Sequence, residues 1–229
     1  FDGFTSDLIR LDSSRVVKIP DDFDPRVSAF IELITVAYQG ISKFSEIATT
    51  PKEALGVCGD GNLGFITALL LKNKFPESKV IVFGKHLENL NLFSFADEIY
   101  QIHNVPDDFA IDHGFECVGS SASQSAIEQI IDLINPQGTI NLFGVSEYPI
   151  PINTRMVLEK GLTIQGNSRS EREDFVGVVE TLKQNPQLFE YLEKLVSNIL
   201  EINTLTDLKD AFDKDYISHF GKTILKWNK

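Results

Sequence analysis

Short apolar runs alternate with segments of helical periodicity along most of this chain. Runs typical of buried parallel strands lie at 54–58, 80–83, 99–102, 111–118, 139–144 and 162–166. Between them, apolar residues recur at helical spacing over 63–75 and 124–134. This alternation predicts an α/β fold, a doubly wound sheet of six parallel strands that binds its ligand at the carboxyl ends of the strands.

The two ends of the chain carry patterns of a different kind. At the start, we expect strands at 5–11 and 15–19 and a helix at 26–44. After the sixth strand, we expect helices at 170–183 and 204–216 and strands at 196–202 and 221–227. Two short strands cannot form a stable core by themselves, so the first of these segments needs a partner elsewhere.

A glycine-rich turn follows the first predicted strand, with the sequence GDGNLG. The residues expected to contact a cofactor here are Gly59, Gly61, Asn62, Leu63 and Gly64. The first glycine allows a tight turn, the second a close approach of a pyrophosphate, and the third the packing of helix on sheet. The start of the helix offers free N–H groups to the phosphates. Because the motif lies within a complete strand–helix–strand unit, it predicts dinucleotide binding.

The end of the second strand predicts which dinucleotide binds. An acidic residue usually binds the ribose hydroxyls about 20 residues beyond the glycine turn. Gly84 takes that place here, and Lys85 and His86 follow it. Without a carboxylate there is room for a 2′-phosphate, and the lysine supplies a cation for a charge-assisted contact. We therefore expect NADP(H), and an aspartate at position 84 to reverse the preference; the alternative is that Lys85 is an ordinary solvated lysine.

Composition excludes several classes of function. The chain has 229 residues, 42% of them hydrophobic, and a net charge of −12, which argues against binding to nucleic acid or anionic membranes. No apolar run approaches the roughly 18 residues of a membrane span, and no secretory signal is seen, so a cytoplasmic enzyme is expected. Cys58 and Cys117 each lie in a predicted strand without a metal-ligand spacing, which argues against a structural zinc site or a disulfide.

Several longer stretches carry a resemblance to a known family. They are ELITVAYQGI (32–41), the segment 59–85, FECVG (115–119), SQSAI (123–127) and the segment 144–170. These residues resemble the medium-chain, zinc-type alcohol dehydrogenases, and within them the bacterial ribulose-5-phosphate reductases. The resemblance covers essentially the whole chain. It implies NADPH-dependent reduction of D-ribulose 5-phosphate to D-ribitol 5-phosphate for teichoic-acid and capsular polymer synthesis.

The resemblance also implies a domain organisation. Family members have a Rossmann cofactor domain between two parts of a GroES-like catalytic domain. By this similarity, 1–24 is the end of the catalytic domain, 25–166 is the cofactor domain and 167–229 returns to the catalytic domain. The Cys and the His-Glu pair of the family's zinc site have no counterpart in this sequence. The chain thus resembles an N-terminally truncated piece, expected to be inactive and metal-free alone, with zinc only in a longer parent protein.

The resemblance assigns roles to single residues as well. Glu32 resembles the family's acidic residue at the catalytic zinc, and Thr35 the hydroxyl residue beneath the nicotinamide. Further cofactor contacts implied by the resemblance are Gly119, Arg169 and Lys222, with Arg155 as a weaker candidate for the sugar phosphate. The alternatives are a capping or salt-bridged carboxylate for Glu32, a threonine bonded within its own helix for Thr35, and surface ion pairs for the basic residues.

The expected partners follow from the resemblance and from the sheet. The substrate is a small sugar phosphate, and the product implies association with a ribitol-5-phosphate cytidylyltransferase. Sheet edges are commonly paired, so we expect a homodimer through the sixth strand. Two other hypotheses stay open: a zinc-free oxidoreductase similar to the quinone reductases, against which Glu32 argues, and an NADP-binding sensor or scaffold without turnover.

Overall fold

The computed structural model describes residues 8–217 and 220–228. Its main sheet consists of β1 (Ala54–Cys58), β2 (Lys79–Gly84), β3 (Glu98–Gln101), β4 (His113–Glu116), β5 (Thr139–Leu142) and β6 (Thr163–Gly166). All neighbouring strands are parallel, in the order β3-β2-β1-β4-β5-β6. The predicted fold class is confirmed. The order reverses direction between β1 and β4, which places the ligand crevice at the carboxyl ends of these two strands.

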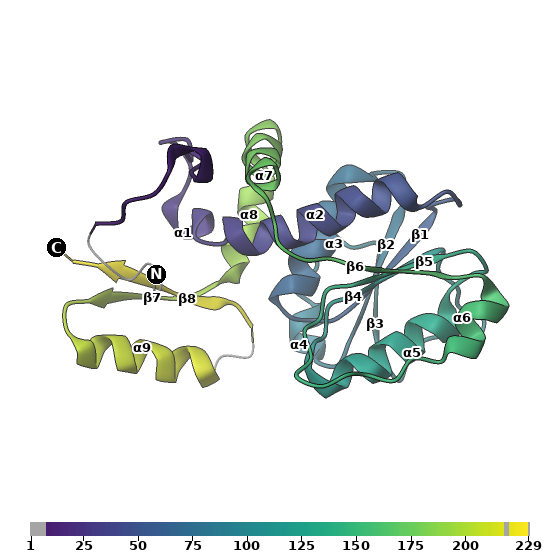
Figure 1. The fold of residues 1–229 in the computed structure, drawn as a ribbon. Helices are drawn as coiled ribbons and strands as arrows, with labels where there is room; N and C mark the ends of the chain where they lie inside the picture. Colours follow the sequence, from purple (N-terminus) through teal and green to yellow (C-terminus); the bar gives the residue numbers. More distant parts are fainter. Residues whose placement is uncertain (1–7, 218–219, 229) are drawn as a thin grey trace.

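Helices cover both faces of this sheet (Figure 1). One face carries α2 (Ile31–Ile47) and α3 (Asn62–Lys74), and the other carries α5 (Ser123–Leu133) and α6 (Thr154–Lys160). Successive strand residues point to opposite faces, so Leu55 and Val57 belong to the core beneath α2 and α3, whereas Cys58 belongs to the core beneath α5. Because β1 and β2 are buried on both faces, these two strands are almost continuous apolar runs.

Helix α2 is held in place by a buried stripe of residues at helical spacing. Ile34, Ala37, Ile41 and Phe44 are all at most 2% exposed. The Phe44 ring packs edge-on against Phe115 of β4, with ring centroids 5.0 Å apart. This ring contact holds the last turn of α2 against the sheet, while buried Ile34 holds the first turn, which carries Glu32.

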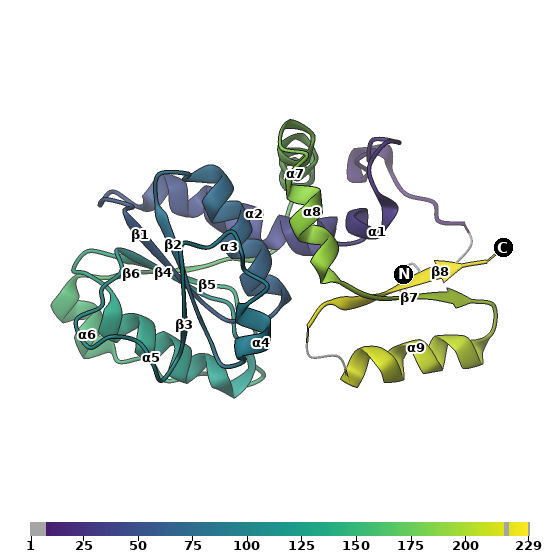
Figure 2. The same cartoon turned by 180° about the vertical axis from the view of Figure 1, so that it is seen from behind.

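The rest of the chain forms a smaller part beside the main sheet (Figures 1 and 2). Its helices are α1 (Pro25–Ser28), α7 (Arg172–Gln184), α8 (Leu188–Leu192) and α9 (Leu205–Ile217), and its strands are β7 (Val196–Ile202) and β8 (Lys222–Trp227). The two strands pair in parallel and α9 runs along them. The early and late segments meet where the Phe23 and Phe189 rings lie 4.9 Å apart and Arg26 pairs with Glu193 at 2.8 Å. Their assignment to a catalytic domain stays a prediction.

Several sequence predictions need correction. Residues 8–11 and 15–19 do not form strands; instead the Asp12 carboxylate accepts a hydrogen bond from Ser14 N and begins a 3-10 turn, η1 (Ser13–Arg15). Residues 5–7 lie outside the described part. The helix expected at 26–44 is divided into α1 and α2. The strand expected at 111–118 is shorter because the chain turns after Glu116. Helices α4 (Leu87–Leu90), α6 and α8 were not predicted.

Candidate cofactor site

The three glycines of the turn between β1 and α3 have different surroundings. Gly59 has φ 134°, and a methyl group on Gly64 would lie 2.0 Å from the Gly59 carbonyl oxygen. These two positions therefore need glycine for the turn and for helix packing, as predicted. A methyl group on Gly61 would meet nothing within 4 Å. Gly61 is the N-cap of α3 and offers no side-chain cap, so open space lies at the helix N-terminus, where a pyrophosphate fits.

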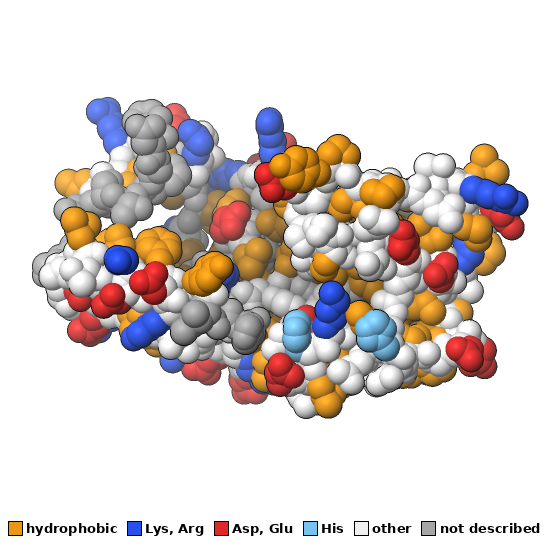
Figure 3. Space-filling model, turned by 90° about the horizontal axis from the view of Figure 1, so that it is seen from below, with side chains coloured by type: hydrophobic (Ala, Val, Ile, Leu, Met, Phe, Trp, Pro, Cys, Tyr) orange, Lys and Arg blue, Asp and Glu red, His pale blue; other side chains and the backbone are white. Residues whose placement is uncertain are grey.

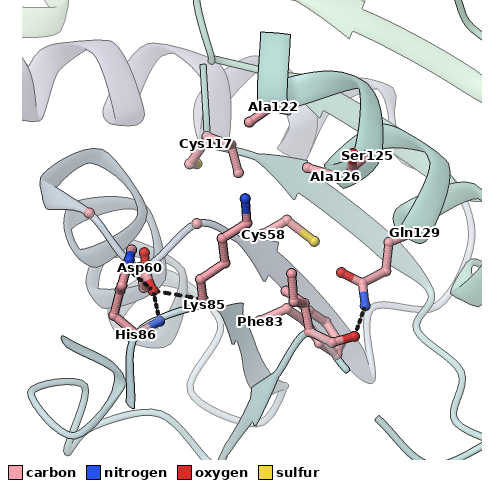
Figure 4. A pocket seen from close by; sticks show the side chains of 15 residues that line it. Cys58, Asp60, Phe83, Lys85, His86, Cys117, Ala122, Ser125, Ala126 and Gln129 are labelled. Carbon is pink, nitrogen blue, oxygen red and sulfur yellow. Dashed lines mark hydrogen bonds and ion pairs between the residues drawn. The ribbon is translucent and has the colours of Figure 1, made fainter. Parts of the chain in front are cut away.

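A cavity of about 300 Å³ lies beside this turn, at the carboxyl ends of β1 and β2 (Figure 4). Its walls are the glycine turn (59–61), the end of β2 (83–86), and residues of η2 (Ser120–Ala122) and α5. Five predicted cofactor residues line it: Gly59, Gly61, Gly84, Lys85 and His86. The other three predicted residues of the turn do not line the cavity; they form the first turn of α3 (Asn62, Leu63 and Gly64).

Asp60 ties the glycine turn to the end of β2, and sequence reasoning missed it. Its Oδ2 atom accepts hydrogen bonds from Lys85 N at 2.7 Å and from His86 N at 2.6 Å, and lies 3.1 Å from His86 Nδ1. A side chain at Gly84 would bring its Cβ to 2.6 Å from the Asp60 Cβ. The small size of residue 84 therefore makes room for Asp60. The only signal in the sequence was an acidic residue between the first two glycines.

Lys85 extends its side chain across the cavity (Figure 4). Its ammonium group reaches toward Ala122 and Cys117 on the opposite wall. It forms no ion pair or side-chain hydrogen bond with any residue that the structure describes. On the face shown in Figure 3, acidic and basic side chains are both spread over the surface, and one basic side chain lies between two histidines. The lysine is thus available to an anionic group bound in the cavity.

Asn62 joins the glycine turn to the smaller part of the molecule. Its Nδ2 atom donates to Gly221 O at 3.0 Å, and its Oδ1 atom accepts from Gly221 N at 2.8 Å. This pairing holds Gly221, which has φ 80°, beside the start of α3. The next residue, Lys222, donates to Asp215 Oδ2 at 3.1 Å. The polar atoms of the Asn62 side chain are therefore engaged by the main chain, a role that the glycine motif did not predict.

Asp215 keeps its charge in this arrangement. Partial burial acts to raise its pKa, but hydrogen bonds from Thr223 N and from the Lys222 ammonium group outweigh burial, and the pKa is lowered overall. Lys222 consequently faces a carboxylate in this structure. A cofactor phosphate would have to compete with Asp215 for the Lys222 ammonium group.

Glu32 lies apart from the cofactor cavity. It lines a second cavity of about 570 Å³ together with Arg15 and Arg172. Thr35 is fully buried, and its hydroxyl donates to Glu32 O at 2.6 Å within the helix. This bond is the pattern expected of a threonine bonded within its own helix. Glu32 thus lines a cavity with two arginines and a second glutamate, Glu171, whereas Thr35 lines neither cavity.

Arg169 and Arg155 lie in different settings. Arg169 follows β6 and has φ 59°, in the left-handed region that is rare outside glycine. Its carbonyl accepts a hydrogen bond from the buried Gln39 Nε2 at 2.8 Å, which holds that conformation. Arg155 is exposed on α6, where its Nε atom lies 3.9 Å from Glu159 Oε2. The structure therefore places Arg155 in the surface ion pair proposed as the alternative.

The described residues do not assemble a zinc site. They contain no group of three or more His, Cys, Asp or Glu side chains that could hold a metal ion. Cys58 and Cys117 are buried, and burial raises the pKa of both thiols, that of Cys117 to about 12, so neither is a thiolate at neutral pH. Glu32 could supply one ligand, and a tetrahedral catalytic zinc needs three from protein.

No helix in the described part of the chain combines the length and the apolar character needed to cross a membrane.

Comparison with known proteins places this geometry among dehydrogenases. Residues 88–184 match a family model described as zinc-binding dehydrogenase. The chain is 48% identical over 227 residues to the ribulose-5-phosphate reductase of Bacillus spizizenii, covering 99% of this chain and 67% of that protein. It is 47% identical to ribulose-5-phosphate reductase 1 of Staphylococcus aureus, again over 99% of this chain and 66% of that protein. The chain thus spans about two thirds of the length of these relatives.

A solved structure gives the same result in three dimensions. The crystal structure of S. aureus TarJ in complex with NADPH superimposes with a TM-score of 0.92 at 46% identity. The match covers 96% of this chain and 69% of that one. The resemblance read from the sequence is therefore confirmed at the level of both sequence and fold.

Proposed function

Because the chain belongs to the zinc-binding dehydrogenase family, we propose that it is the cofactor-binding portion of an NADPH-dependent ribulose-5-phosphate reductase. The reaction is the reduction of D-ribulose 5-phosphate to D-ribitol 5-phosphate. The observation that carries the proposal is the cavity at the carboxyl ends of β1 and β2. An open helix N-terminus borders it, and so does a lysine that has no ion-pair partner among the described residues. Identities of 47% and 48% to two named ribulose-5-phosphate reductases support the choice of substrate.

Different residues of the crevice bind different parts of the cofactor. The pyrophosphate lies over Gly61 and the first turn of α3, where main-chain N–H groups and the helix dipole favour an anion. The adenosine half lies in the cavity between the glycine turn and the end of β2. Lys85 and His86 face the 2′-phosphate there, and Asp60 fixes their main chain. The bound cofactor supplies the hydride that reduces the substrate carbonyl.

The second cavity is the place that we propose for the substrate. Arg15 and Arg172 line it together with Glu32 and Glu171, and either guanidinium could pair with the phosphate of a sugar phosphate. The catalytic zinc of the family does not fit the described residues by themselves, since Glu32 would be its single ligand. A zinc site therefore requires ligands from outside these residues, and this chain alone is expected to be inactive.

Two experiments separate this proposal from its alternatives. Following NADPH absorbance with D-ribulose 5-phosphate, in a protein as long as the relatives, distinguishes a reductase from an NADP-binding sensor or scaffold. Metal analysis of the same protein distinguishes a zinc enzyme from a zinc-free relative of the quinone reductases. Absence of both turnover and NADPH binding would reject the proposal, whereas binding without turnover would favour the sensor.

We propose in addition that the protein forms a homodimer through β6. This strand is an edge of the main sheet, and its residues are only partly buried. An exposed edge offers unpaired main-chain groups to a second copy, and pairing would make one continuous sheet. Light scattering at tens of micromolar tests the dimer, and a monomer would contradict it. We also propose that the protein associates with a ribitol-5-phosphate cytidylyltransferase, because its product would be a pentitol phosphate. The location that we propose for the reaction is the cytoplasm.

A further inference from the structure

Glu116, at the end of β4, carries a buried carboxylate that the proposed function does not use. Glu116 is 1% exposed. Its Oε1 atom accepts hydrogen bonds from Val118 N at 2.8 Å, Gly119 N at 3.1 Å and Ser123 Oγ at 2.8 Å. Its Oε2 atom accepts one from Gly144 N at 3.0 Å. Burying a charged group is costly unless it is fully bonded, and these four donors meet that requirement.

The four donors come from two separate loops. Val118, Gly119 and Ser123 belong to the loop and helix start that follow β4, whereas Gly144 belongs to the loop that follows β5. The Glu116 carboxylate is therefore a bridge between these loops. The bridge is closely packed, because a methyl group on Gly144 would lie 2.4 Å from Glu116 Oε1 and 2.3 Å from Gly119 N. No larger residue fits at position 144 without separating the loops.

The backbone of the first loop adopts an unusual conformation that the bridge maintains. Gly119 has φ 77°, and the next residue, Ser120, has φ 56°. A left-handed conformation costs energy in a residue other than glycine and persists only where surrounding contacts enforce it. Here the contacts are the Glu116 carboxylate and a hydrogen bond from Ser120 N to Val145 O at 2.7 Å. Both connect the β4 loop to its neighbours.

The two loops border the crevice differently: Val118 and Ala122 of the loop after β4 also line the cavity beside β1 and β2, whereas the loop after β5 borders only the opposite side. In a doubly wound sheet, the two nucleotides of a dinucleotide lie on opposite sides of the point where strand order reverses. The adenosine half belongs to β1 and β2, where Asp60 and Lys85 lie, so the nicotinamide half belongs to the side of β4 and β5. There the bridged loops line a cavity of about 490 Å³, with Ser120 and Val145 in its wall.

We propose that Glu116 is a positioning residue for the nicotinamide half of the cofactor. It contacts neither cofactor nor substrate; it holds the loops after β4 and β5 at the separation that this half requires. This inference rests on the proposed function, since it assumes that NADPH binds in the crevice. A residue needed only for folding would instead affect both halves of the cofactor alike.

Binding of NADPH and of 2′,5′-ADP, the adenosine half alone, tests the inference. Glu116→Gln keeps one oxygen for the β4 loop but turns an N–H group toward Gly144 N. We expect NADPH to bind about tenfold more weakly and 2′,5′-ADP within twofold of the unaltered chain. Glu128→Gln is the matched control, because Glu128 is an exposed carboxylate on α5 that accepts a bond from Gln124 at 3.0 Å. It should leave both affinities unchanged.

Ser123→Ala gives a milder perturbation of the same carboxylate, should Glu116→Gln fail to fold. It removes one of the three donors to Oε1, and we expect about a threefold loss for NADPH with no change for 2′,5′-ADP. Equal weakening of both ligands in either folded variant, or no weakening of NADPH, would overturn the inference. If neither ligand binds the unaltered chain, the proposed function itself fails, and that outcome is distinct from the others.

Discussion

Lys85 is the residue on which the choice between NADPH and NADH depends most directly. Its ammonium group extends into the cofactor cavity and has no ion-pair partner among the described residues. Replacing it with alanine therefore breaks no existing interaction and leaves the main-chain bonds to Asp60 in place. Lys85→Ala should weaken the binding of NADPH and leave the binding of NADH nearly unchanged, because only NADPH carries the 2′-phosphate.

The size of this effect follows from the type of contact. A hydrogen bond to a charged group contributes about 1.5–3 kcal/mol, and about 1.4 kcal/mol corresponds to a factor of ten in affinity. Lys85 is exposed, so solvent screening favours the lower end of this range. We expect a loss of about ten- to a hundredfold. The preference for NADPH should decrease with added salt, since the screening length falls from about 10 Å at 0.1 M to about 3 Å at 1 M.

Calorimetric titration of the chain with both cofactors measures this preference. Lys79→Ala serves as the control, because Lys79 lies at the opposite end of β2 and pairs with Glu98 at 3.4 Å. It removes the same charge at the other end of β2 without touching the cavity. Equal affinity of the unaltered chain for NADPH and NADH would refute the reasoning, and so would an equal effect of the two alanine variants. Lys85 would then be an ordinary surface lysine.

Four further predictions concern the glycine turn, its contacts, and the buried histidine at the start of β4. Gly64→Ala should lower the free energy of unfolding by about 1–3 kcal/mol, since its methyl group would meet the Gly59 carbonyl, whereas Gly61→Ala should leave the denaturation midpoint unchanged and weaken NADPH binding. Asn62→Ala should cost about 1–3 kcal/mol and speed amide hydrogen exchange in β8, because it removes both bonds to Gly221. Gly84→Asp, expected from the sequence to favour NADH, should instead destabilise the chain by collision with Asp60, and Asp60→Gly/Gly84→Asp together should bind NADH better in titration. Burial lowers the pKa of His113 in the folded protein below its value of about 6.5 in the unfolded chain. The free energy of unfolding, measured in urea, should therefore be highest above about pH 6.5, and this contribution should be lost as the pH falls through the lower pKa of the folded state. His113→Gln should remove that pH dependence.

The sequence was a good guide wherever one physical requirement determines the residue. The central strands β1 and β2 are buried on both faces and are almost entirely apolar, so their short hydrophobic runs indicated them directly, and the regular alternation with helices indicated the other four. Gly59 and Gly64 were interpreted correctly because tight turns and close packing leave few alternatives to glycine. Helix α6 could have been found as well, since Asn153 caps its start and Gly161, with φ 62°, ends it.

Contacts between distant segments could not be predicted in this way. Asn62 and Gly221 are 159 residues apart, and no local pattern indicates that they pair. Asp60 occupies a variable position of the glycine motif, and its role depends on how closely β2 approaches the turn. In the sequence, Glu116 was interpreted only as a residue of the fourth strand. Its burial and the four hydrogen bonds to its carboxylate could be found only in the structure. The prediction of two strands near the start of the chain was wrong, because a short alternation of apolar and polar residues forms a strand only where a partner strand lies beside it.

The central claim is that this chain forms the cofactor-binding portion of an NADPH-dependent ribulose-5-phosphate reductase. It is tested most directly by following NADPH absorbance with D-ribulose 5-phosphate in a protein that joins this chain to the remaining third of the relatives' length. We predict oxidation of NADPH that needs the sugar phosphate and is much slower with NADH. No oxidation in a folded protein of that length, or equal rates with the two cofactors, would contradict the claim.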